Sequence, residues 1–251
     1  MEKVLQCAMD IGEQMLICGG EVHRVEDSVK RICLACGAKR VDPFIITSCM
    51  IVTVTDTEGS SYTQTRRITS MGANNEMLHN LNQLSRRICA LGHIPDDYEK
   101  AFDNVSNSKK YPTYVLALAN MLMAGVFTLF FLGTLTESLI SVIVGGVIFL
   151  VSFLIDKTHL NNIFSKYISA LAATAFAVAA LRLGLVTSID KIIIGCIMLL
   201  IPGSGLTNGL RDLFTGDSIA GLLRSIEAVL CALAIAAGYF SAIFILGGLG
   251  A

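Results

Sequence analysis

The sequence predicts an α-helical polytopic membrane protein of about five transmembrane helices, with an N-terminal cytosolic α+β domain. Three observations lead to this fold class. The mean hydropathy is +0.65 and 53% of the residues are hydrophobic. Only 16% are charged, against about 25% in a typical soluble domain. The charges are also unevenly placed: residues 1–112 hold 13 basic and 14 acidic residues, whereas residues 113–251 hold 6 and 6.

We therefore expect a head over residues 1–110 and a transmembrane helical bundle over residues 111–251. A net charge of −1 argues against a nucleic-acid partner, since such proteins carry a basic surface. The high hydrophobic content excludes a disordered chain. Acidic and amide residues interrupt residues 1–19, so we expect no secretory signal and a head that stays in the cytosol.

Two amphipathic helices are predicted at the start of the head. Apolar residues at helical spacing mark the first helix over residues 3–18, which Gly19 and Gly20 end. The second helix begins near Glu21 and ends before Gly37, because glycine suits the left-handed position after a helix.

A short β-region and two further helices follow. The run over residues 44–55 is rich in β-branched side chains and predicts one strand, with a turn at 56–60 and a return strand over 62–68. A third helix is capped by Asn74 or Asn75 and extends to about residue 91. Pro95 opens a fourth. Since a two-stranded hairpin alone is marginal in water, we expect helices or a neighbouring subunit to cover it.

The eight cysteines predict no metal or cofactor. A cytosolic head keeps its thiols reduced, where they serve as small buried hydrophobic side chains. The single C-x-x-C at Cys33 and Cys36 has no second pair and no histidine at zinc spacing.

Five apolar stretches are expected to span the membrane, because about 20 helical residues cross its hydrocarbon core. They cover residues 114–135, 139–155, 168–185, 189–207 and 219–246. In the fourth, only residues 189–201 precede Pro202, so this helix continues past the proline or stops within the membrane. Lysines and arginines concentrate in the segments on the same side as the head, which predicts that the head is cytosolic. We expect the chain to lie in the cell (inner or plasma) membrane. Five spans place the C-terminus outside.

The segment over residues 202–224 contains the candidate site. Pro202 and several glycines loosen the helix, and freed backbone groups at membrane depth are tolerated only against protein or water. Arginines bind carboxylates in bidentate fashion. We expect the substrate to be bound by Ser204, Thr207, Asn208, Arg211 and Arg224. We expect proton coupling or ion pairing from Asp212, Asp217 and Glu227. The alternative is a solvated cytosolic turn.

At these residues the chain resembles the threonine/serine exporter family. The resemblance is carried by residues 12–16, 19–27, 65–68 and 81–86, and most specifically by the Pro202 to Arg224 pattern. It implies efflux of threonine and serine, or of a dicarboxylate such as succinate, across the inner membrane. Family members fuse this half to a second membrane half, so the resemblance implies a second small multi-span membrane subunit and a homo- or hetero-oligomer.

Two other functions stay open. The first is a membrane-anchored hydrolase, in which Ser48 or Cys49 is the nucleophile; the chain has no G-x-S-x-G or H-E-x-x-H motif. Its acid–base group would come from Glu21, His23, Arg24, Glu26 and Asp27. The second is a regulatory head with an anion-binding or lipid-facing patch made of Arg66, Arg67, Arg86 and Arg87. We expect no catalytic residues.

Overall fold

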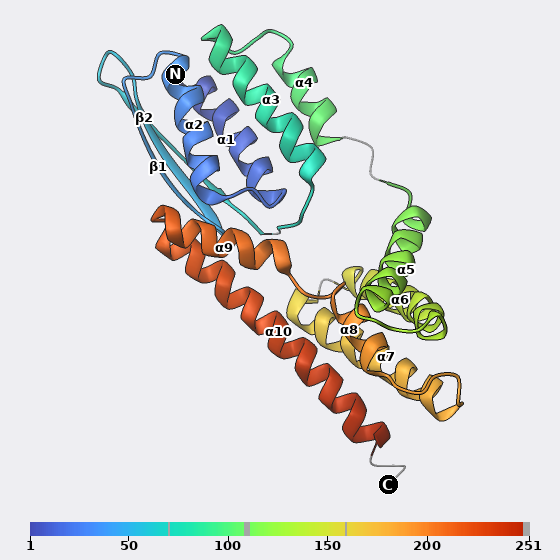
Figure 1. Cartoon of the computed structure of the whole chain (residues 1–251). Coiled ribbons are helices and arrows are strands. Elements are labelled where there is room, and N and C mark those ends of the chain that lie inside the picture. Colours follow the sequence, from blue (N-terminus) through green and yellow to red (C-terminus); the bar gives the residue numbers. More distant parts are fainter. Residues whose placement is uncertain (70, 108–110, 159, 248–251) are drawn as a thin grey trace. The chain divides into compact units, whose positions relative to one another are not determined.

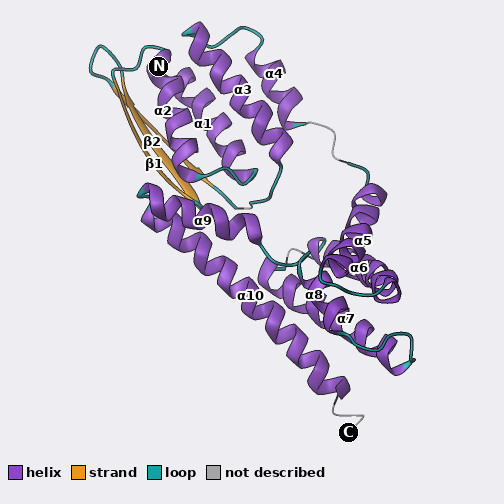
Figure 2. Cartoon of the chain, viewed as in Figure 1, coloured by secondary structure: helices purple, strands orange, loops and turns teal. Residues whose placement is uncertain are grey.

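A computed structural model describes residues 1–69, 71–107, 111–158 and 160–247 (Figure 1). Helices make up most of the chain, and one small sheet lies near the N-terminus in the sequence (Figure 2). The chain divides into two compact units. The first contains residues 1–109 and 204–226, and the second contains residues 110–203 and 227–251. The segment of the candidate site therefore belongs mostly to the same unit as the head.

Four helices of the first unit follow the predicted pattern. They are α1 (Glu2–Ile17), α2 (Val22–Ala35), α3 (Asn75–Leu91) and α4 (Tyr98–Ser106). Gly19 has φ +85° after α1, and a Cβ there would lie 2.6 Å from the Gly72 carbonyl oxygen. Asn74 caps α3 by accepting a hydrogen bond from the Met77 amide at 3.0 Å.

The sheet has three strands, so the prediction of a two-stranded hairpin is wrong. β1 (Arg40–Ile46), β2 (Cys49–Thr55) and β3 (Ser61–Arg67) form an antiparallel sheet in the order β1-β2-β3. The run expected as one strand contains the end of β1, a tight turn and all of β2, with Ile46 paired to Cys49. The turn residues Thr47 and Ser48 are β-compatible and carry no glycine or asparagine signal, which explains the error.

The core of the first unit lies between the sheet and the helices. One face of the sheet is buried, as Met50, Val52 and Val54 show by their complete loss of solvent exposure. On the other face, Phe44 pairs with Ile51 and both remain exposed. Buried and exposed residues alternate along β2, because successive side chains of a strand point to opposite faces of the sheet.

The second unit contains the apolar helices α5 (Thr113–Phe130), α6 (Leu135–Asp156) and α7 (Asn162–Arg182), the short α8 (Asp190–Ile197), and most of α10 (Ser218–Gly247). Among the described residues, α5, α6, α7 and α10 are long and apolar enough to cross a membrane. The stretch expected as the fourth span is not one helix, because α8 ends at Ile197 and α9 (Gly203–Thr215) starts after Pro202. Hydrogen-bonded turns continue from α8 to Ile201, and Pro202, which has no amide donor, prevents them from extending into α9.

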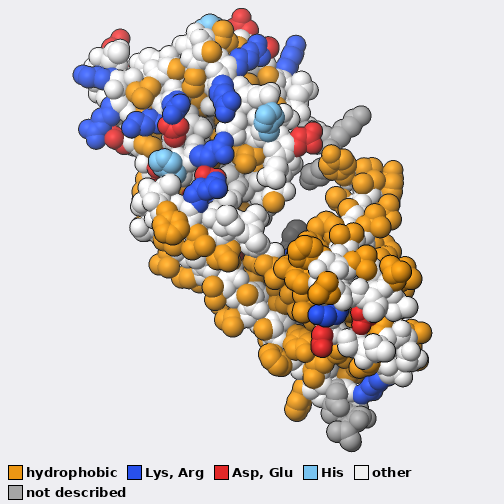
Figure 3. Space-filling model, viewed as in Figure 1, with side chains coloured by type: hydrophobic (Ala, Val, Ile, Leu, Met, Phe, Trp, Pro, Cys, Tyr) orange, Lys and Arg blue, Asp and Glu red, His pale blue; other side chains and the backbone are white. Residues whose placement is uncertain are grey.

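Small residues bring these apolar helices close together. A Cβ at Gly145 of α6 would lie 2.8 Å from the Ala124 side chain, and one at Gly195 of α8 would lie 2.8 Å from the Thr128 backbone nitrogen. Such contacts are typical of helix packing in lipid. Figure 3 shows hydrophobic side chains along α5 and α10, and charged side chains over the head.

Candidate functional site

Two glycines bring α9 and α10 into backbone contact. A Cβ at Gly221 would lie 2.6 Å from the Gly209 carbonyl oxygen and 2.6 Å from the Leu213 nitrogen. A Cβ at Gly209 would lie 3.0 Å from that of Arg224. The helices can approach this closely only because neither position carries a side chain.

The turn between α9 and α10 is closed by Gly216, whose φ is +101°. The Asp217 amide donates to the Asp212 carbonyl at 2.9 Å, and the Gly216 amide donates to the Leu213 carbonyl at 3.3 Å. These two bonds form the Schellman motif, in which glycine takes the left-handed position. The turn and the glycine contact together place Asp212 of α9 beside Arg224 of α10.

Arg224 and Asp212 form a buried ion pair. Arg224 is 5% exposed and Asp212 is fully buried. Nη1 of Arg224 lies 3.4 Å from Oδ2 of Asp212, and Nη2 donates to the Gly20 carbonyl at 2.7 Å. Burial raises the pKa of the Asp212 carboxyl, while the Arg224 guanidinium and the Val22 amide partly offset this rise. The carboxyl thus takes up a proton more readily than an exposed aspartate does.

The loop after α1 is held by three residues of α9 and α10. Asn208 donates from Nδ2 to the Gly19 carbonyl at 3.0 Å, Arg224 binds the Gly20 carbonyl, and Arg211 forms an ion pair with Glu21. The structure therefore brings together three of the five residues predicted to bind substrate. The other two, Ser204 and Thr207, lie exposed on α9.

The predicted proton-coupling acids separate into two groups. Asp212 and Asp217 lie in the first unit, and Oδ2 of Asp217 lies 3.7 Å from Nδ1 of His23. Glu227 belongs to the second unit and is exposed. Glu26 interacts electrostatically with this first group although it is distant in sequence. Burial raises the pKa of its carboxyl, and the negative charge of Asp217 raises it further. Its Oε1 accepts the Ile45 amide at 2.9 Å.

A cavity of about 190 Å³ lies beside this loop. Gly19, Gly20 and Glu21 line it, with Arg24 of α2 and Asn208 of α9. Its volume corresponds to about six waters at about 30 Å³ each, which is room for a small metabolite. The cavity offers a carboxylate, a guanidinium and an amide to its occupant.

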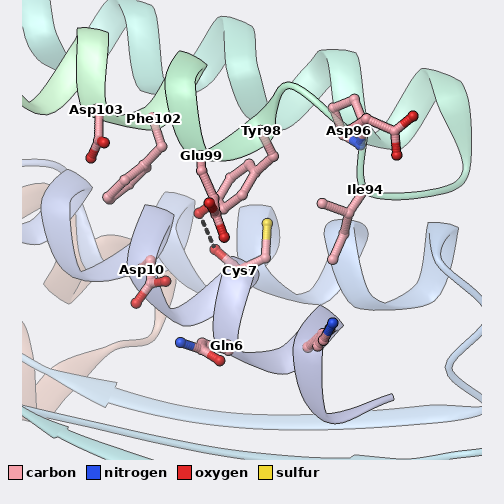
Figure 4. Close-up of a pocket in the computed structure, with 11 residues that line it drawn as sticks. Gln6, Cys7, Asp10, Ile94, Asp96, Tyr98, Glu99, Phe102 and Asp103 are labelled. Carbon is pink, nitrogen blue, oxygen red and sulfur yellow. Dashed lines mark hydrogen bonds between the residues drawn. The ribbon is translucent and has the colours of Figure 1, made fainter.

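A cavity of about 540 Å³ lies between α1 and α4 (Figure 4). Acidic side chains dominate its lining, among them Asp96, Glu99 and Asp103. The Tyr98 hydroxyl donates to the Cys7 carbonyl at 3.4 Å, as the dashed line in Figure 4 shows. Burial raises the pKa of the Cys7 thiol to about 12, so this thiol is protonated and a poor nucleophile at neutral pH. The excess of carboxylates disfavours an anionic ligand.

The predicted patch of four arginines is divided in the structure. Nη2 of Arg66 lies 2.7 Å from Asp10, and Nη1 lies 3.1 Å from Glu13. Arg87 pairs with Asp97 at 3.0 Å. These two cations are neutralised by carboxylates of the head. Across the described residues, no group of three histidine, cysteine or acidic side chains is placed to hold a metal.

The sequence reasoning missed a line of buried polar groups in the second unit. Thr128 of α5 donates to Ser141 of α6 at 2.6 Å, and Ser138 donates to the Gly125 carbonyl at 3.0 Å. Ser138, Ser141 and Gly145 recur at i, i+3 and i+7 on α6, which is the signal that could have found them. Glu137 forms the capping box of α6 with Thr134 and is buried.

Comparisons with known proteins cover nearly the whole chain. Residues 6–246 match a family model described as "Putative threonine/serine exporter". The chain is 26% identical to "Probable succinate transporter subunit YjjP" of Escherichia coli (strain K12), over 97% of this chain and 95% of the relative. It is also 26% identical to the protein of the same name from Klebsiella aerogenes, over 97% and 92%. No solved structure matches the chain significantly.

Proposed function

We propose, because the chain belongs to the threonine/serine exporter family, that it is a subunit of an inner-membrane efflux transporter for small carboxylate-bearing metabolites. The candidates are threonine, serine or a dicarboxylate such as succinate. Four long apolar helices support a membrane protein, and two relatives named as subunits of a succinate transporter support the substrate class. The proposed role is transport without catalysis.

The observation that carries the substrate class is the pair formed by Arg211 and Glu21. The Arg211 side chain is 56% exposed, so a solute can reach it, and it already binds a carboxylate of the chain itself. We propose that a substrate carboxylate replaces Glu21 on this guanidinium. Asn208 lines the adjoining cavity and supplies an amide to the same ligand. Ser204, Thr207 and Arg224 complete the proposed binding set.

The number of membrane crossings between the head and α9 supports a substrate path through the second unit. α9 binds the loop after α1, so the head and α9 share one side of the membrane in this proposal. Three long helices, α5 to α7, lie between them in sequence. Two segments on the same side of the membrane must be separated by an even number of crossings. A fourth crossing is therefore needed, and the segment over residues 190–201 would supply it. At about 1.5 Å per residue this segment spans only about 18 Å.

Such a short segment can lie at membrane depth only where protein covers it. Ile192, Cys196 and Leu200 are almost completely buried in the second unit, as this condition requires. Transporters place substrates at broken helices of this kind. We propose that the substrate crosses the bundle at the break between α8 and α9. Asp212, Asp217 and Glu227 are the acids proposed to couple export to protons.

The word "subunit" in the names of both relatives implies a partner. We propose that this partner is a second small multi-span membrane subunit, and that the cytosolic head of this chain contributes to assembly or regulation. The family match and the relatives named as transporter subunits favour transport over a membrane-anchored hydrolase.

Export from cells tests the proposal. Cells that express the chain with its membrane partner are loaded with labelled succinate or threonine, and efflux is measured for Arg211→Gln and for Arg67→Gln. Arg67 is an exposed arginine at the end of β3, so its variant controls for charge alone. We expect R211Q to reduce efflux at least tenfold, as loss of a charge-assisted contact of about 1.5–3 kcal/mol implies, and R67Q to leave it unchanged. Equal efflux by both variants would contradict the assignment.

A further inference from the structure

A third cavity lies in the head, and of its lining residues Arg24 also lines the cavity beside the loop after α1. Its volume is about 280 Å³, and α2 and α3 line it from two sides. α2 contributes Arg24, Asp27, Ser28 and Arg31, which recur at i, i+3, i+4 and i+7. α3 contributes Asn82, Ser85, Arg86 and Cys89 at the same spacing. This spacing places each set on one face of its helix.

The charge of this cavity is positive. Its lining contains three arginines and one carboxylate, that of Asp27. Asp27 is engaged by Arg31, whose Nε lies 2.8 Å from Oδ2. Arg24 makes one long hydrogen bond, of 3.5 Å, to Asn82. Within the described part of the chain, Arg86 forms no ion pair and no hydrogen bond.

Two neutral polar side chains of the lining already donate to their own helices. Ser28 donates to the Arg24 carbonyl at 2.8 Å, and Asn82 donates to the Leu78 carbonyl at 2.7 Å. The charged donors that the cavity offers to a ligand are the guanidinium N–H groups. A site of this composition selects its ligand by negative charge and by the geometry of its oxygen acceptors.

We infer that this cavity binds a phosphate-bearing small anion. Guanidinium groups approach it from two helices, and a tetrahedral phosphate accepts hydrogen bonds from several directions at once. A planar carboxylate is satisfied by one fork, as Arg87 shows, whose Nη1 and Nη2 each donate to one oxygen of Asp97 at 3.0 Å. The cavity has room for about nine waters at about 30 Å³ each, which suits a small phosphate group better than a large nucleotide. Arg86 lines this cavity and not the one assigned to transport, so R86Q tests this inference separately from the transport proposal.

The experiment uses the full-length chain, purified in a neutral detergent, and calorimetric titration with pyrophosphate. Arg24→Gln and Arg86→Gln are compared with Arg67→Gln, the same change at an exposed arginine outside the cavity. We expect R24Q and R86Q each to weaken binding at least tenfold, and R67Q to leave it within about twofold. Because Arg86 is exposed, its variant should unfold at the unchanged temperature, which separates a lost ligand contact from a lost fold.

Two further arms identify the source of the phosphate. Titration of the same detergent-solubilised chain with mixed micelles of phosphatidylcholine, with or without phosphatidylglycerol, reports binding of a lipid headgroup. If R86Q weakens binding of the anionic micelles and pyrophosphate competes with them, the natural ligand is a headgroup; if only pyrophosphate binds, it is a soluble phosphate compound. The inference is overturned if pyrophosphate does not bind at millimolar concentration, if all three variants weaken binding equally, or if succinate binds the cavity as tightly as pyrophosphate does.

Discussion

Arg224 shows how a single buried charge can organise a junction between helices. Its guanidinium binds a main-chain carbonyl of the head loop and the carboxylate of Asp212 at the same time. Removing two charges from water is costly, and the pair recovers this cost only with good geometry and further hydrogen bonds. The arrangement therefore stabilises one relative position of the head loop, α9 and the first turns of α10.

The first prediction concerns this pair. Arg224→Gln leaves a buried carboxylate without its cation and should lower the free energy of unfolding by about 3–5 kcal/mol. Asp212→Asn should have a similar effect, and the double variant should recover part of the loss, since no unpaired charge then remains. Thermal unfolding followed by circular dichroism measures all three. Strictly additive losses would show that the two side chains are not coupled.

The second prediction concerns the pH dependence produced by Glu26. Burial raises the pKa of this carboxyl above its ordinary value of 4.5, so the folded chain binds the proton more tightly than the unfolded chain does. Its contribution to stability is therefore complete below pH 4.5 and declines as the pH rises through the raised value. Glu26→Gln keeps an oxygen for the Ile45 amide and should remove this decline.

The measurement is the unfolding temperature from about pH 4 to about pH 8. Glu58→Gln, in the exposed turn after β2, is the matched control and should retain the wild-type profile. An identical slope for E26Q and the wild-type chain would contradict the role assigned to Glu26.

At the scale of elements, the third prediction concerns the glycines where α9 meets α10. Gly221→Ala places a methyl group 2.6 Å from two backbone atoms of α9, which side-chain motion cannot relieve. We expect a loss of about 1–3 kcal/mol in the free energy of unfolding, and reduced export. Gly203→Ala is the control, because its Cβ meets nothing within 4 Å. A neutral G221A variant would show that the helices separate easily.

The elements differ in how well the sequence predicts them. The helices of the head follow from apolar residues at helical spacing and from cap residues such as Asn74, which are local signals. The division of residues 44–55 into two strands depends on pairing between distant residues such as Phe44 and Ile51. Local β-propensity is the same on both sides of that turn, so the sequence alone cannot place it.

At the scale of the whole molecule, the fourth prediction concerns membrane topology. The proposed fourth crossing by residues 190–201 makes α10 the fifth and places the end of α10 outside the cytoplasm. Alkaline phosphatase fused after α10 should then be active, and green fluorescent protein at the same point should not fluoresce. The reverse pattern would mean four crossings, as the count of long apolar helices alone allows. The same reporters fused before α5 control for expression.

The candidate site was also only partly predictable. Residue types in the segment over 202–224 identified arginines and acids suited to a carboxylate. Their partners, the Gly19 and Gly20 carbonyls and Glu21, lie 189 to 204 residues away in the sequence. Only the fold brings these groups together, and the role of Glu21 as the carboxylate that holds Arg211 follows from that contact.

The burial of the cysteines has a practical consequence. All eight are free, and burial raises the pKa of the thiols of Cys7 and Cys33 to about 12, so the folded head should resist alkylation. Cys36, Cys49 and Cys89 are half-buried and should react first with a fluorogenic maleimide. A chain with serine at these three positions should fluoresce only after it unfolds. Since the chain contains no tryptophan, these thiols are the natural optical reporter of its opening.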